Sequence, residues 1–99
     1  MNGQVARYGH GFEVVFGEWV VYHDPEPDAR PVADLIACLP VAELQRLARG
    51  RARLHAAWHA QVWRDGRLTS HDEADRNRYA RLRARLNERA LAILQARYS

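Results

Sequence analysis

The stretch that decides the first part of the fold is FEVVFGEWVVYH, residues 12–23. Two runs of β-branched and aromatic residues flank Gly17-Glu18, and a two-residue loop with glycine in its first position is typical of a type II′ hairpin. We therefore predict strands at about 12–16 and 19–23, with QVARY (residues 4–8) as a third strand. Because two strands alone are marginally stable, this β-ribbon of residues 1–24 must pack against the rest of the chain.

Prolines and acidic residues interrupt this pattern at residues 25–31 and predict an extended surface loop. Residues 32–39 follow as a short helix, with a proline at its start and Pro40 after its end. Cys38, the single cysteine, fits a small buried apolar position in this helix. No base is identifiable beside Cys38, so we do not expect it to be a catalytic nucleophile.

Two longer helical segments, 41–64 and 71–98, fill the rest of the chain. Gly66 is placed to cap the end of the first, and Thr69 or Ser70, each followed three residues later by an acid, offers a capping box for the second. A short connection predicts antiparallel neighbours. The sequence thus predicts a single α+β domain, residues 1–99: a β-hairpin or three-stranded antiparallel meander, a short helix, and a long antiparallel helical hairpin.

Helical periodicity of 100° per residue selects an apolar face on each long helix. The predicted core consists of Leu44, Leu47, Leu54, Trp58, Val62, Tyr79, Leu82, Leu86 and Ile93, with Val41, Ala48 and Ala90 on the same arcs. Arg51 and His55 intrude on the first arc, and their burial there has no explanation from the pattern. Gly50 costs about 1 kcal/mol relative to alanine in a helix, which indicates a close approach or a bend.

Charge is divided unevenly along the chain. Residues 1–40 hold two arginines and six acids, net −4, whereas residues 41–99 hold thirteen arginines and six acids, net +7. The basic part therefore suits an acidic partner, unless the acidic part of the same chain packs on it. All 15 basic side chains are arginine. A GC-rich genome explains this bias, and selection for bidentate contacts to phosphate or carboxylate is the functional alternative.

Arginines at three- and four-residue spacing form rows that suit a phosphate backbone. These candidate binding residues are Arg46, Arg49, Arg53, Arg78, Arg81, Arg85 and Arg89. Trp63, at the edge of the apolar arc, is a candidate for stacking on a base. We therefore expect a non-enzymatic, nucleic-acid-binding regulatory or accessory factor.

The same side chains also fit a protein–protein interaction module, an adaptor or inhibitor, because arginine and tryptophan are enriched in interface hot spots. Helices of roughly 36 and 42 Å exceed what a small ribbon can cover, so a homodimer is expected. A second alternative is a metal site, in which His55 and His59 face His71 and Asp75 at i, i+4 spacings. The simpler reading of these residues is a hydrogen bond between His59 and Asp75.

Several function classes are not indicated. The sequence contains no glycine-rich phosphate loop, no G-x-S-x-G and no H-E-x-x-H, so we expect neither enzymatic activity nor a cofactor. It also lacks an apolar run of about 18 residues and a basic start followed by an apolar block. These features predict a cytoplasmic protein with no membrane partner.

Overall fold

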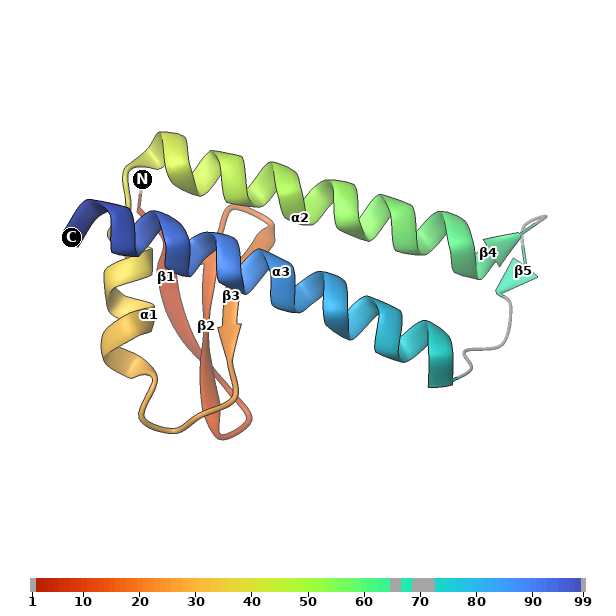
Figure 1. The fold of residues 1–99 in the computed structure, drawn as a ribbon, viewed down its shortest axis with the longest axis horizontal. Helices are drawn as coiled ribbons and strands as arrows, with labels where there is room; N and C mark the ends of the chain where they lie inside the picture. Colours follow the sequence, from red (N-terminus) through yellow and green to blue (C-terminus); the bar gives the residue numbers. More distant parts are fainter. Residues whose placement is uncertain (1, 65–66, 69–72, 99) are drawn as a thin grey trace.

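The computed structural model describes the backbone of residues 2–64, 67–68 and 73–98, and the side chains of residues 2–56, 77 and 80–98. A three-stranded antiparallel sheet is followed by helices, which places the protein in the α+β class. The elements are β1 (Gln4–Tyr8), β2 (Gly11–Phe16), β3 (Trp19–Asp24), α1 (Arg30–Ala37), α2 (Val41–Val62), β4 (Trp63–Arg64), β5 (Arg67–Leu68) and α3 (Glu73–Tyr98). The sheet and α1 lie beneath one end of the α2–α3 pair (Figure 1).

The sheet has the strand order β1-β2-β3, joined by two tight hairpins. Tyr8 pairs with Gly11 and Phe16 pairs with Trp19, so each loop has two residues. The second loop begins with Gly17 at φ +62°, a conformation that glycine adopts at little cost. The meander predicted from the alternation and turn pattern is therefore confirmed, including its third strand.

A bulge in β3 departs from simple alternation. Val14 pairs with Tyr22 and Val15 pairs with Val20, which leaves Val21 as the extra residue. A bulge re-aims the side chains beside it, and here both Val21 and Tyr22 are buried. The edge strand β3 can therefore contact both long helices while its partner β2 packs against α1.

The short helix begins and ends earlier than the predicted span of 32–39. It runs from Arg30 to Ala37 because Ala29 already accepts the first helical hydrogen bond, from the amide of Ala33 at 3.0 Å. The expectation that Cys38 is buried is wrong. Cys38 is the exposed C-cap residue, since Ile36, Ala37 and Leu39 occupy the buried positions around it.

The buried faces of the two long helices pack against the sheet and α1. The buried residues are Leu44, Leu47, Ala48 and Leu54 of α2 and Leu86, Ala90 and Leu94 of α3. This confirms the predicted burial of Leu44, Leu47, Leu54 and Leu86, while Leu82 and Ile93 are only partly buried. Val41 is 38% exposed, contrary to the prediction, because it is the first residue of α2. The side chains of Trp58, Val62 and Tyr79 lie outside the described residues.

The far end of the first long helix also differs from the prediction. The first helix ends at Val62 rather than at 64, and β4 and β5 pair antiparallel through Trp63 and Leu68. Asp-Gly between the two short strands favours a tight hairpin over a continued helix. The second helix is described from Glu73 to Tyr98, and its predicted start at 71 lies outside the described residues. The proposed caps at Gly66, Thr69 and Ser70 fall outside the described residues.

Gly50 marks a close approach between α2 and α3. A Cβ atom at this position would lie 3.2 Å from Cδ2 of Leu86 and 3.6 Å from Nη1 of Arg89. The absent side chain thus lets the two helices approach each other above the sheet. In the described parts of the chain, no helix combines the length and apolarity needed to cross a bilayer.

Candidate functional site

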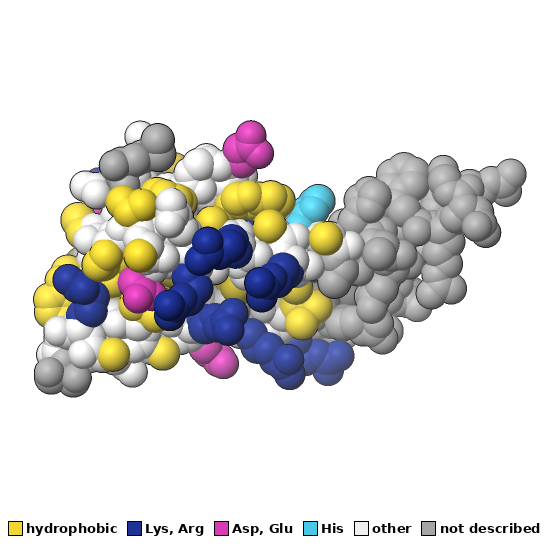
Figure 2. Space-filling view, turned by 90° about the horizontal axis from the view of Figure 1, so that it is seen from above, with side chains coloured by type: hydrophobic (Ala, Val, Ile, Leu, Met, Phe, Trp, Pro, Cys, Tyr) yellow, Lys and Arg dark blue, Asp and Glu magenta, His cyan; other side chains and the backbone are white. Residues whose placement is uncertain are grey.

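The first candidate site is a cationic surface, here called the outer arginine face. It comprises Arg46, Arg49 and Arg53 of α2 and Arg81, Arg85 and Arg89 of α3, all exposed. Figure 2 shows arginine side chains gathered over the α2–α3 pair. Glu43 lies 3.7 Å from Arg46 in an ion pair along α2, and Arg30 pairs with Asp34 on α1. The structure therefore brings these predicted arginines to the surface of adjoining helices.

A groove with an apolar floor runs between α2 and α3 beside these arginines. Its volume is about 530 Å³. Its lining is apolar at Gly50, Leu54, Leu82, Leu86 and Ala92, and polar at Arg85, Glu88 and Arg89. Leu54 and Leu86 are buried, whereas Leu82 is half-buried. The arrangement offers apolar contact and guanidinium donors to one bound group.

The remaining predicted site residues lie mostly outside the described side chains. These are Trp63, Arg78, His59, His71 and Asp75. His55 is described and is exposed, which corrects its expected place in the buried arc. Its ring lies 5.8 Å from that of Trp19, at the start of β3. Beyond this point of contact the α2 face has no sheet beneath it to bury the imidazole.

The described residues form no metal centre. Among the described residues, no three histidine, cysteine, aspartate or glutamate side chains come together in a group that would hold an ion. Since His59, His71 and Asp75 are outside that set, the predicted four-residue cluster stays a prediction.

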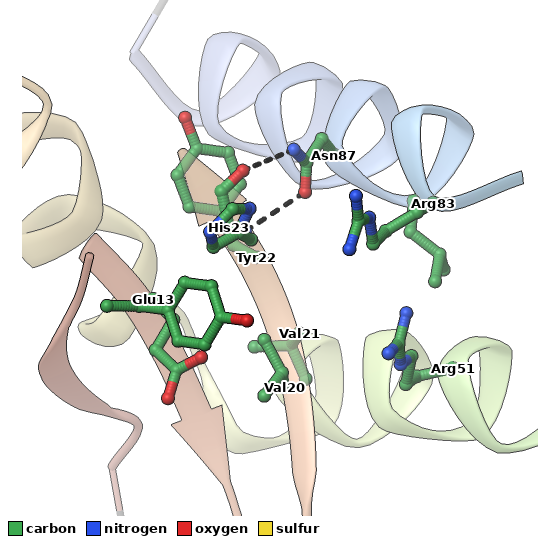
Figure 3. Close-up of a pocket in the computed structure, with 10 residues that line it drawn as sticks. Glu13, Val20, Val21, Tyr22, His23, Arg51, Arg83 and Asn87 are labelled. Atoms are coloured by element: carbon green, nitrogen blue, oxygen red, sulfur yellow. Dashed lines mark hydrogen bonds between the residues drawn. The ribbon is translucent and has the colours of Figure 1, made fainter. Parts of the chain in front are cut away.

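The second candidate site is a smaller cavity, here called the inner pocket, between β3, α2 and α3. Its volume is about 210 Å³, and it is lined by Tyr8, Glu13, Val20, Val21, Tyr22, His23, Arg51, Arg83, Leu86 and Asn87. Figure 3 shows the side chains of Arg51 and Arg83 extending from α2 and α3 into the space between the helices and the sheet. Two cationic groups from distant parts of the sequence therefore share one cavity.

Helical periodicity explains why both arginines face inward. Arg51 lies four residues after Leu47 and three before Leu54, and Arg83 lies three residues before Leu86. Residues at these spacings share a helix face. Each arginine thus lies on the same side of its helix as buried leucines. Arg51 is half-buried and Arg83 is exposed, so a long apolar stem can pack while the charged group reaches the cavity.

Asn87 fixes the position of α3 against the sheet edge. The amide of His23 donates a 3.1 Å hydrogen bond to Asn87 Oδ1, and Asn87 Nδ2 donates to the His23 carbonyl (Figure 3). One side chain thereby satisfies both backbone groups of an edge-strand residue, which otherwise offer an unpaired edge. The contact spans 64 positions in sequence.

The wall of the inner pocket also carries titratable groups. His23 and Glu13 are cross-strand partners, and the His23 ring meets Tyr8 edge-on with centroids 4.9 Å apart. The Nε2 atom of His23 is buried and has no hydrogen-bond partner in the described structure. Tyr22 donates a 2.8 Å hydrogen bond to Asp24. Burial first, and then this contact with Asp24, raises the pKa of the Tyr22 phenol well above its ordinary value of 10.0.

Sequence reasoning did not identify Arg83, Asn87, Glu13 or His23 as site residues. Arg83 was detectable, because its spacing from Leu86 places it on the apolar arc of α3, as Arg51 is on that of α2. His23 and Glu13 become partners only through the strand register, and Asn87 reaches His23 only after α3 packs on β3. These two relations have no local signal in the sequence.

Comparison of the chain with protein-family models, curated proteins and solved structures finds no match.

Proposed function

We propose that this protein is a non-enzymatic nucleic-acid-binding protein whose outer arginine face contacts phosphate groups, in keeping with a regulatory or accessory role. The observation that supports this proposal is the gathering of exposed arginines from two adjoining helices (Figure 2). A guanidinium group donates to phosphate in a bidentate manner, which a lysine ammonium does not. Neutralised phosphates release their condensed counterions, and this release drives association at low salt.

The spacing of the arginines fits a polyanion. Arg46 and Arg53 are seven residues apart, or roughly 10 Å along α2, and Arg81 and Arg89 are eight apart, or roughly 12 Å along α3. Each row spans about three steps of a duplex strand at roughly 3.4 Å per step. With Glu43 and Glu88 as the neighbouring acids on these helices, the face keeps a net positive charge for a ligand to neutralise.

The test compares two double variants with the same loss of charge. Arg85→Gln/Arg89→Gln removes two guanidinium groups from the outer arginine face. Arg7→Gln/Arg30→Gln removes two that lie over the ring of Phe12 instead, at 6.0 and 5.5 Å from its centroid. Binding to short duplex and single-stranded DNA and RNA is measured at about 50 and 200 mM salt, a range over which six or more phosphate contacts cost about a thousandfold in affinity.

The wild type is expected to bind with that steep salt dependence. The α3 double variant should bind more weakly, with the slope of log affinity against log salt reduced by about two. The Phe12-side double variant should keep the wild-type slope. Absence of binding at the lower salt, or equal losses in the two variants, contradicts the proposal.

A second candidate is an acidic, amphipathic helix from a protein partner, and the apolar floor of the α2–α3 groove supports it. A helix of this kind places apolar residues in the groove and carboxylates against Arg85 and Arg89. Leu82→Gln distinguishes the two functions, because it makes the half-buried edge of the groove polar without removing a cation. A loss of peptide binding in this variant with nucleic-acid binding unchanged favours the protein partner.

The arrangement of the long helices leads to a proposal about assembly. We propose that α2 and α3 continue as an antiparallel hairpin toward their connecting turn and that a second copy covers this part. Figure 1 supports the proposal, because both helices extend past the sheet. Light scattering at several concentrations should give twice the mass of 11.4 kDa. A mass of one chain at all concentrations contradicts the homodimer.

A further inference from the structure

We infer that the inner pocket is a second binding site, for a small phosphomonoester, with Arg51 and Arg83 holding the phosphate group. This site is separate from the outer arginine face, although Leu86 lines both the inner pocket and the α2–α3 groove. The inference rests on the side chains in the cavity and does not depend on nucleic-acid binding.

The first argument is the convergence of two cations. Arg51 comes from α2 and Arg83 from α3, and both point into the same cavity (Figure 3). An anion bound by both guanidinium groups accepts charge-assisted hydrogen bonds from two elements at once, and the fork geometry of arginine suits a phosphate.

The second argument is the polar wall away from the arginines. Glu13 and His23 lie opposite each other on β2 and β3, next to Tyr8. The buried Nε2 atom of His23 lacks a hydrogen-bond partner in the described structure, and such an atom normally has one. A ligand hydroxyl in this cavity provides a donor for the Glu13 carboxylate and a polar group beside His23, which lines the same cavity. The ligand therefore combines an anionic end with a hydroxylated end.

The third argument is size. A cavity of about 210 Å³ is smaller than the roughly 300–1,000 Å³ typical of sites for drug-sized ligands. It corresponds to about seven water volumes, at roughly 30 Å³ each. This space admits a phosphate with a short polar chain and excludes a duplex. Glu13 also limits the charge of the ligand, because its carboxylate repels a second anionic group at the same end of the pocket.

The test is a titration of the full chain with inorganic phosphate and with glycerol 3-phosphate, followed by NMR at the His23 amide and the arginine side-chain Nε–H groups. Glycerol is the uncharged control ligand. Arg51→Met and Arg83→Met each retain an apolar stem and remove one cation. Arg97→Met is the matched control, because Arg97 lies on the same helix as Arg83 but is exposed and belongs to neither the inner pocket nor the outer arginine face.

Both phosphate probes should shift the signals of His23, Arg51 and Arg83 in a saturable manner, with glycerol 3-phosphate binding more tightly. Each pocket variant should weaken binding about tenfold or more, the effect of losing one charge-assisted contact, while Arg97→Met should leave it unchanged. If Arg51→Met does not fold, the exposed Arg83 provides the decisive variant.

Two results overturn the inference. One is the absence of shifts at these residues with both phosphate probes. The other is an equal loss of affinity in Arg97→Met and Arg83→Met, which indicates general attraction of anions to a basic chain. A variant that loses phosphate binding but keeps the wild-type salt dependence with nucleic acid shows that the inner pocket and the outer arginine face are independent.

Discussion

The two faces of α2 place adjacent residues in opposite surroundings. Leu47 is 1% exposed and belongs to the core formed with the sheet and α1, whereas the side chain of its neighbour Arg46 is 67% exposed. The inner face holds the long helices onto the sheet, and the outer face carries charge without core contacts. This contrast indicates that changes on the outer face are able to alter binding while the fold persists.

The largest expected effect on stability comes from a substitution at Leu47, on the buried face of α2. Leu47→Ala should lower the free energy of unfolding by about 2–5 kcal/mol, because it removes buried methyl groups and leaves a cavity. Arg46→Ala, one residue away, should cost at most about 1 kcal/mol, since it removes an exposed guanidinium group and its 3.7 Å ion pair with Glu43. Urea unfolding followed by circular dichroism measures both. Similar losses in the two variants contradict the division between faces.

A smaller effect is expected at the contact between α3 and the edge of β3. Asn87→Ala leaves the amide and carbonyl of His23 without their side-chain partner, which should cost about 1–3 kcal/mol. Asn77→Ala is the matched control on the same helix, because Asn77 is exposed, and it should change stability by less than about 0.5 kcal/mol. Hydrogen exchange at the His23 amide should accelerate only in the first variant. Unchanged exchange there shows that Asn87 does not protect the strand edge.

The smallest effect is expected from the pH dependence of Tyr22. The folded state raises the pKa of this phenol above its unfolded value of 10.0, so the folded state favours the protonated form. The resulting stabilisation is complete below about pH 10 and is lost as the pH rises above it. Unfolding measured from pH 8 to 11 should show a steeper alkaline loss in the wild type than in Tyr22→Phe. Parallel curves contradict the role of this buried hydroxyl.

Local patterns predicted those parts of the fold that depend on neighbours in sequence. The glycine at position 17 with its flanking β-branched residues predicted the hairpin, and the spacing of Leu44, Leu47 and Leu54 predicted one buried face. The end of the first long helix, predicted at 64, was misplaced, because a helix cap and a tight hairpin use similar residues. The burial of His55 was predicted wrongly, because helical periodicity identifies the apolar face of α2 but not how much of that face the sheet covers.

The sequence by itself determined the order of the three-stranded sheet and the three helices, the two tight turns of that sheet and the arginine rows, because each follows from spacings of two to four residues. Only the tertiary structure decided that β3 carries a bulge, that Asn87 meets His23 across 64 positions, and that Arg51 and Arg83 enter one cavity. These relations depend on how helices pack against a sheet edge. Side-chain shape and contact determine that packing, and neither is encoded in a local repeat.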